Sequence, residues 1–329
     1  MNEQKQYKED TGIDLLKFIS ATLIIMSHTG FLKSYNEVLD FYFVNVLFRW
    51  CVPFFFICAG FYLNEKLLKY EIRLLVLYSI WTLFYTIINR MNFSIESFVN
   101  HIRFGIIGPF WYFPSLIIGI LFIYMLTRFL PDKISCLIVL LMYIIGLFGD
   151  AYANVMPMGS WYTVIFGHIH ALLFSYTSRN GLFFCSLFIW IGKMLKKYRC
   201  IVRTALKKIS SFWILLPIVI CFSLLALELH FYINYKTGFD ANVLISIVPL
   251  AVLLFILGLK YNPFNARFGV IMRNCSTIMY TIHPYYMGKF RSITESSIIN
   301  YLLVFGMSLI TALVIVFISK YIKLLKYSF

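Results

Sequence analysis

The sequence predicts an all-α fold: a polytopic membrane bundle of about ten transmembrane helices with a short re-entrant or interfacial segment and both termini in the cytoplasm. Three observations favour this class. The 329 residues are 61% hydrophobic and only 13% charged, which is much less charged than a soluble domain. Long apolar runs recur along the chain. The 29 Lys and Arg residues, against 14 Asp and Glu, are concentrated between some of these runs.

Ten apolar runs have about the length that a transmembrane helix needs. They lie at 13–32, 43–63, 72–89, 109–127, 134–149, 181–195, 211–231, 242–259, 274–290 and 298–319. An eleventh run, 161–176, is shorter, and we expect it to be re-entrant or interfacial. We therefore expect one transmembrane domain over 13–319, between a cytoplasmic N-terminal segment at 1–12 and a cytoplasmic tail at 320–329.

The distribution of basic residues sets this topology, because cytoplasmic loops are enriched in Lys and Arg. If 161–176 crossed the bilayer, the densest basic stretch, 193–208, would lie opposite the other basic loops. If it does not cross, 20 cations lie inside and 7 outside. The net charge of +15 is then an orientation signal, and we expect the lipid bilayer and no nucleic acid as a partner. The two remaining cations, Lys17 and Arg49, lie within apolar runs.

The first run contains three ionisable residues, Asp14, Lys17 and His28, and a charge within a span often marks function. Eleven residues separate Lys17 from His28, which places them about 20° apart on one helix face and roughly 16 Å apart in height. Asp14 also suits a helix N-terminus, and with Lys17 it is placed to form a simple ion pair. Function and structure are equally compatible with that pair. For His28 we favour function, because imidazole exchanges protons near neutral pH.

Three further cations have two interpretations each. Arg49, about two turns into the second run, either snorkels to the outer interface or binds an anion. Pro53 and Gly60 in the same run indicate a kink and a close helix contact. Lys69 and Arg73, at i and i+4 near the inner surface, are either ordinary membrane anchors or a grip for the phosphates of a nucleotide-bearing donor.

A last group of polar and aromatic residues is a candidate for substrate binding. It comprises Trp111, Tyr112, Arg179, Asn180, Glu228 and His283. Trp111 and Tyr112 equally fit an aromatic belt, and Asn180 fits a helix N-cap. Glu228 is placed to compensate Arg49 or Arg179. The seven cysteines have no metal-type spacing, so we interpret them as packing residues and expect no metal.

Five segments in order resemble the acyltransferase-3 family of polytopic membrane proteins. They are DLLKFISATLIIMSH, RWCVPFFFICAGF, FWYFPSLI, SRNGLFF and STIMYTIHP, and the resemblance runs from about residue 12 to the last span. Within the family the chain looks most like the membrane half of the serine or alanine racemases of D-serine-type vancomycin resistance. Those proteins typically carry a pyridoxal-phosphate racemase domain after the membrane domain. We expect neither that domain nor pyridoxal phosphate within residues 1–329.

The resemblance implies a multi-pass protein of the bacterial plasma membrane that transfers an acyl group, often acetyl, from cytoplasmic acyl-CoA to a sugar or other envelope acceptor. His28 matches the family's essential first-helix histidine. Lys17 stands where an arginine is usual, and a lysine cannot make a bidentate phosphate contact. Lys69 and Arg73 approximately match a basic motif linked to the CoA side.

The racemase-linked branch implies a different role, the uptake of L-serine for a cytoplasmic racemase. Arg49 would then bind the carboxylate of the amino acid, Glu228 or Asp14 the ammonium group, and His28 or His283 would relay protons. The absence of a clear inverted repeat of broken helices counts mildly against a carrier. A third possibility is a non-catalytic membrane anchor for a separate racemase.

Overall fold

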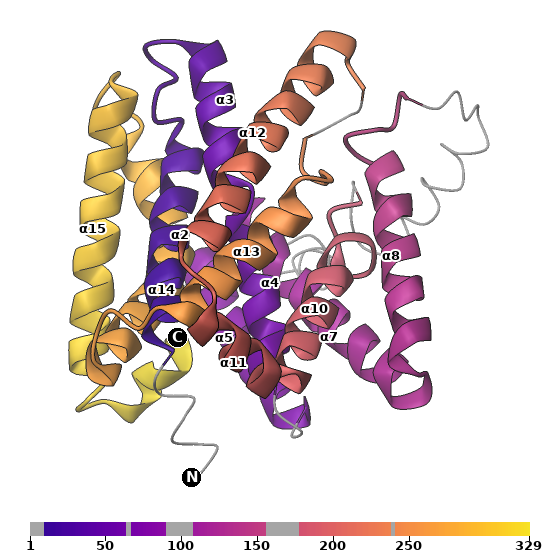
Figure 1. The fold of residues 1–329 in the computed structure, drawn as a ribbon. Coiled ribbons are helices and arrows are strands. Elements are labelled where there is room, and N and C mark those ends of the chain that lie inside the picture. The colour runs from indigo at the N-terminus through magenta and orange to yellow at the C-terminus, as the bar shows by residue number, and fades with distance from the viewer. Residues whose placement is uncertain (1–9, 64–66, 90–107, 156–177, 238–240) are drawn as a thin grey trace. The chain divides into compact units, whose positions relative to one another are not determined.

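The computed structural model describes residues 10–63, 67–89, 108–155, 178–237 and 241–329 (Figure 1). The segment 161–176, which we expect to be re-entrant or interfacial, lies outside the described residues. Within the described ranges the regular structure is helical throughout, which confirms the predicted all-α class. The described chain packs as two compact units. Unit 1 comprises 1–55, 199–222 and 250–329, and unit 2 comprises 56–198 and 223–249.

Unit 1 is built mainly from the two ends of the chain. Its helices are α2 (Thr11–Thr29), α3 (Glu37–Phe48), α11 (Arg199–Lys208), α14 (Ala266–Phe290), α15 (Ser297–Ile318) and η3 (Lys323–Ser328). It also takes the first part of α4 (Cys51–Tyr62), the first part of α12 (Phe212–Tyr235) and most of α13 (Ile247–Lys260).

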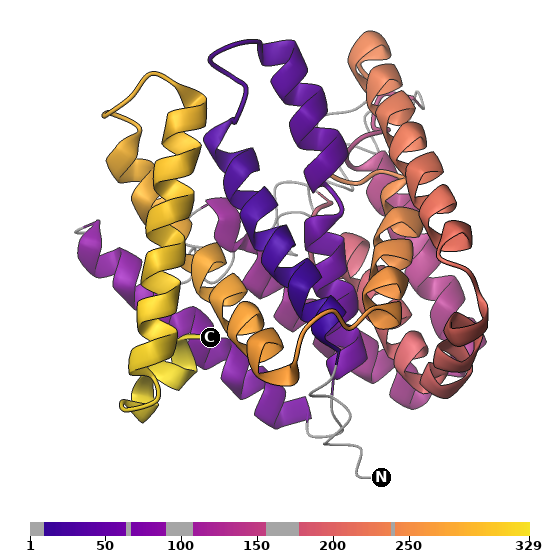
Figure 2. The same cartoon turned by 60° about the vertical axis from the view of Figure 1, so that its left-hand side comes forward.

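The helices α2, α14 and α15 lie side by side in unit 1 (Figure 1 and Figure 2). Their facing surfaces bury apolar side chains such as Ile25, Ile278 and Val304, which are all 0% exposed. Gly12 lets α2 approach α13 closely, because a Cβ there would lie 2.0 Å from the carbonyl oxygen of Tyr261. The first helix is therefore packed tightly between the last helices of the chain.

Unit 2 is built from the middle of the chain. Its helices are α5 (Leu67–Ile88), η1 (Gly108–Trp111), α7 (Tyr112–Phe129), α8 (Asp132–Phe148), η2 (Gly181–Cys185) and α10 (Ser186–Lys197), with the remaining parts of α4, α12 and α13. Gly60 and Gly192 let α4 and α10 cross closely, since a Cβ on either would lie 2.0 or 2.1 Å from a carbonyl oxygen of the other helix. The close contact that Gly60 indicates is thereby confirmed.

Each of the ten predicted spans contains helix, and the number of ten membrane crossings stays a prediction. Six described helices are long and apolar enough to cross a membrane, and α13 is a shorter apolar helix. The six are Thr11–Thr29, Glu37–Tyr62, Leu67–Ile88, Pro109–Phe129, Phe212–Tyr235 and Ser297–Ile318. The protein is accordingly a multi-pass membrane protein, while the cytoplasmic location of both termini stays a prediction from charge.

The helices differ from the prediction in three places. The run 43–63 is divided into α3 and α4 by a turn at Arg49 and Trp50, and Pro53 lies in the first turn of α4, where proline is tolerated. α14 begins eight residues earlier than predicted, because Asn265 caps it by accepting a hydrogen bond from Phe268 N. α11 forms in a stretch that we expected only as a basic loop.

Candidate functional site

The ionisable residues of α2 lie on one unbroken helix, Asp14 and Lys17 toward its start and His28 near its end. Asp14 is buried in the first turn, where the helix dipole favours a carboxylate. Its Oδ1 lies 3.6 Å from Nη1 of Arg273 on α14. Lys17 is half-buried one turn further along. The structure therefore gives Asp14 an ion-pair partner, Arg273, that the sequence did not suggest.

His28 lies in the last turn of α2, next to the point where the helix ends. Gly30 ends the helix in the left-handed conformation, with φ of 61°, and its N–H donates to the carbonyl oxygen of Ser27. The His28 side chain is exposed.

The ring of His28 stacks on the ring of His283 from α14. The two centroids are 5.4 Å apart and the planes are inclined by 19°. His283 is 0% exposed, so an accessible imidazole lies against a fully buried one. Two histidines that are 255 positions apart in the sequence therefore meet within unit 1, which the sequence could not show.

The hydrogen bonding of His283 fixes its tautomer. Nδ1 lies 3.2 Å from the carbonyl oxygen of Met279, and a carbonyl only accepts, so Nδ1 carries the proton in the neutral ring. Nε2 is then a bare acceptor. It has no hydrogen-bond partner among the described residues, although it is buried. A buried acceptor without a donor lowers the free energy of unfolding by about 1–3 kcal/mol, so Nε2 does not contribute to the stability of the fold.

Arg49 lies at the C-terminal end of α3, and its Nε donates to Oδ1 of Asn45 at 2.6 Å. A cation is favoured at a helix C-terminus. The residue therefore lies at the turn between α3 and α4, within the candidate membrane span Glu37–Tyr62. Because this span begins at Glu37 and not at residue 43, Arg49 lies further along it than the two turns predicted.

Three substrate-binding candidates in unit 2, Arg179, Trp111 and Tyr112, contact neighbouring side chains. The guanidinium of Arg179 lies 4.5 Å from the centroid of the Trp111 ring and donates to Asn242 Oδ1 at 2.9 Å. Tyr112 stacks on Phe56 with centroids 5.0 Å apart. These contacts place both aromatic residues in the packing of the unit.

Asn180 has the capping role predicted for it. Its Oδ1 accepts from the backbone N–H groups of Leu182 and Phe183, both at 3.0 Å, at the start of η2. The capped turn brings in Phe184, whose ring packs against Phe56 and Phe188. The SRNGLFF segment is thus explained by local structure and packing.

Glu228 also stabilises the start of a helix. Its carboxylate accepts from the hydroxyl of Tyr152 at 2.5 Å and from the backbone N–H groups of Ile245 and Ser246 at 2.6 and 2.9 Å, just before α13. Burial and the hydrogen bond to Glu228 raise the pKa of the Tyr152 phenol, so it stays a donor. Among the described residues Glu228 forms no ion pair, and the suggestion that it compensates Arg49 or Arg179 is not supported.

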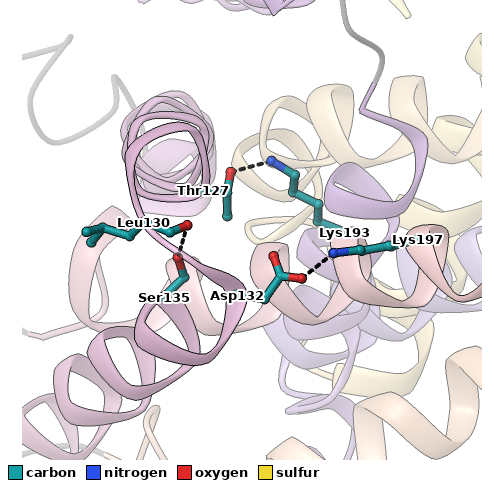
Figure 3. A network of polar contacts seen from close by, with 6 residues as sticks. All are labelled: Thr127, Leu130, Asp132, Ser135, Lys193 and Lys197. Carbon is teal, nitrogen blue, oxygen red and sulfur yellow. Dashed lines mark hydrogen bonds and ion pairs between the residues drawn. The ribbon is translucent and has the colours of Figure 1, made fainter.

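The basic residues at the end of α10 have partners within unit 2 (Figure 3). Nζ of Lys193 bonds to the hydroxyl of Thr127, and Nζ of Lys197 bonds to Asp132 at the start of α8. Nζ of Lys196 donates to the carbonyl oxygen of Leu63 at 2.6 Å. On α5 the side chains of Lys69 and Arg73 are both exposed.

Comparison with known proteins agrees with the resemblance. A family model described as an acyltransferase domain, acyltransferase-3, matches residues 10–320. The chain belongs to the acyltransferase-3 family. No solved structure matches it.

Three curated relatives of this acyltransferase-3 protein are enterococcal racemases. Two are named amino-acid racemase, from Enterococcus faecalis. One is 34% identical over 196 residues, covering 55% of this chain and 27% of the relative, and the other is 26% identical over 350 positions, covering 96% and 47%. The third is named serine/alanine racemase and comes from Enterococcus gallinarum. It is 24% identical, and the match covers 90% of this chain and 44% of the relative. The chain spans about half or less of the length of these relatives.

Proposed function

We propose that this protein transfers an acyl group, with acetyl as the simplest case, from cytoplasmic acyl-CoA to a hydroxyl-bearing acceptor of the cell envelope. The observation that carries the proposal is the pair of stacked imidazoles, in which an exposed His28 lies against a buried His283. Membership of the acyltransferase-3 family supports the class of reaction.

In the proposed reaction His28 acts as the general base. It removes the proton of the acceptor hydroxyl while the hydroxyl oxygen attacks the thioester carbonyl carbon. The carbon–sulfur bond then breaks, and the imidazolium returns the proton to the leaving CoA thiolate. An exposed ring in the last turn of α2 suits this cycle, because the acceptor can reach it.

His283 fits the role of a positioning residue. Its Nδ1–H is committed to the Met279 carbonyl, so its ring is fixed, and the stacked contact restricts the ring of His28. A base whose orientation is fixed by a second group is the general arrangement of nucleophile-activating sites.

In this proposal the cations bind the acyl-CoA donor and stabilise the charge that develops on it. Lys69 and Arg73 offer exposed side chains at i and i+4, a spacing at which two cations reach one phosphate group. Lys17 is half-buried on the helix that carries His28. Arg49, held by Asn45, supplies a fixed cation for the developing oxyanion.

The test is acyl transfer by the purified protein in liposomes, with radiolabelled acetyl-CoA as donor and an envelope extract as acceptor. His28→Ala should lower the rate of label transfer about 100-fold or more. His230→Ala is the matched control, because His230 is exposed on α12 and bonds to Asn234. Absence of transfer by the wild-type protein, or full transfer by His28→Ala, would remove the proposal.

The names of the relatives favour one second candidate, uptake of L-serine for a racemase. In that case Arg49 binds the carboxylate of serine. Glu228 or Asp14 takes the ammonium group in exchange for a present partner, since Glu228 accepts three hydrogen bonds and Asp14 pairs with Arg273. Accumulation of labelled L-serine in proteoliposomes above empty vesicles, lost in Arg49→Gln, would support this role. Equal counts in both would exclude it.

A further inference from the structure

The short helix α11 is attached to unit 1 along one side. Arg203 forms an ion pair with Asp10, which is 2% exposed, directly before α2. Leu206 is buried. Nζ of Lys260, the last residue of α13, donates to the carbonyl oxygens of Leu206 and Ile209 and so satisfies the C-terminal end of α11. The helix is therefore fixed to the start of α2 and the end of α13.

The other side of α11 combines exposed apolar and basic side chains. Ile201 is 69% exposed, and Lys207 and Lys208 are exposed at the helix end. Trp213 is 66% exposed at the start of α12. Between residues 199 and 213 the sequence has four cations and no Asp or Glu. Apolar and basic groups on one exposed surface, followed by a tryptophan, are typical of a helix that lies in the interface of a bilayer.

We propose that α11 lies among the lipid headgroups and that Lys207 and Lys208 bind anionic phospholipids. The sign of the charge selects the partner, because an acidic leaflet attracts each basic residue near its surface while a zwitterionic one does not. Arg203 is already paired with Asp10, which leaves the two terminal lysines as the exposed cations of the helix. The inference does not depend on the proposed acyl transfer.

Lipid bound at α11 also acts on α2, because the two helices are linked. Arg203 and Lys260 connect α11 to the beginning of α2 and the end of α13, and α2 carries His28 at its other end. Anionic lipid bound at α11 therefore holds the inner end of the helix on which the candidate site is built.

The structure offers a native probe for the test. Cys200 is the exposed cysteine on α11, and the other six are buried or half-buried. A spin label on Cys200 of the full chain is followed in nanodiscs in which phosphatidylglycerol replaces phosphatidylcholine stepwise. Collisions of the label with lipid-soluble oxygen and with a water-soluble nickel chelate are compared, and Cys200→Ser shows the background from other sites.

We expect phosphatidylglycerol to increase the oxygen collisions and reduce the nickel collisions. Lys207→Gln with Lys208→Gln should weaken this response about 25-fold in apparent lipid affinity, about fivefold for each lysine. The matched control is Lys289→Gln with Arg291→Gln, which removes the same charge from exposed positions at and after the end of α14 and should leave the response unchanged.

Three results would overturn the proposal. A label that is equally open to the nickel chelate at every lipid composition means that α11 lies in water. A label shielded from both reagents means that protein covers it. An equal loss of the response in the test and control variants means that net charge, and not α11, governs the lipid contact.

Discussion

Three polar residues of unit 2 and the two stacked histidines of unit 1 differ in their hydrogen bonding. In unit 2 Glu228, Asn180 and Lys197 each bond to a helix end or to a charged partner. In unit 1 His28 is exposed, and the buried Nε2 of His283 has no hydrogen-bond partner among the described residues. A polar residue in an apolar run is therefore a weak indicator of function until its hydrogen bonds are known.

This difference separates structural from chemical roles. A carboxylate that receives three donors stabilises the fold, and its loss should reduce stability. An accessible imidazole against a buried one stabilises little, and its loss should reduce turnover. Four substitutions test that division.

Glu228→Ala should lower the free energy of unfolding by about 3 kcal/mol, because it leaves the Tyr152 hydroxyl and two backbone N–H groups before α13 without their acceptor. Thermal unfolding of the purified protein in detergent measures this. His230→Ala, two positions along the same helix, is the control and should change stability by less than about 0.5 kcal/mol. Equal stability of the two variants would mean that the cap is not structural.

His283→Phe should reduce transfer about tenfold while leaving the unfolding temperature unchanged or slightly raised. Phenylalanine keeps the buried ring but removes Nε2, whose lone pair has no donor among the described residues. The rate of label transfer and the unfolding temperature are measured on the same preparation. A large loss of stability with normal turnover per folded molecule would make His283 a packing residue only.

Asn180→Ala should cost about 1 kcal/mol, the usual value of a side-chain N-cap, since the N–H groups of Leu182 and Phe183 lose their acceptor. Asn180→Asp keeps an acceptor oxygen and should recover most of the stability. Failure of the aspartate variant to differ from the alanine variant in thermal unfolding would argue against the cap.

Lys197→Gln should have the smallest effect, because its ion pair with Asp132 is exposed. The hydrogen bond that Lys197 donates to Asp132 raises the pKa of Lys197, so the pair contributes below the ordinary lysine pKa and is lost as the pH rises through the raised value. Unfolding temperatures of the two proteins should differ slightly at neutral pH and converge at strongly alkaline pH. A difference that grows with alkalinity would contradict this.

The helices could be predicted well from the sequence, because apolar runs of spanning length fix their positions within a few residues. The early start of α14 depends on the N-cap hydrogen bond of Asn265, which hydrophobic runs do not encode. The break at Arg49 lies four residues before Pro53, which has no N–H to bond back to the Arg49 carbonyl. Asn180 was identifiable because an N-cap is a local feature.

Contacts between distant helices could not be predicted in the same way. The sequence gives the depth of Asp14, His28, Arg273 and His283 but not the order of the helices around the bundle. The pairing of α2 with α14 alone decides that Asp14 meets Arg273 and that the two histidines meet. Family likeness indicated His28 as a functional residue, and the tertiary structure supplied its neighbour.

The histidine pair of α2 and α14 should be needed for acyl transfer, and the carboxylate of Glu228 for the stability of the fold. The most direct test measures acetyl transfer per folded molecule and unfolding temperature together for His28→Ala and Glu228→Ala. We expect His28→Ala to lose about 100-fold in transfer with an unchanged unfolding temperature, and Glu228→Ala to unfold earlier while its folded fraction turns over normally. Normal transfer by His28→Ala, with loss of transfer in stably folded Glu228→Ala, would contradict the account.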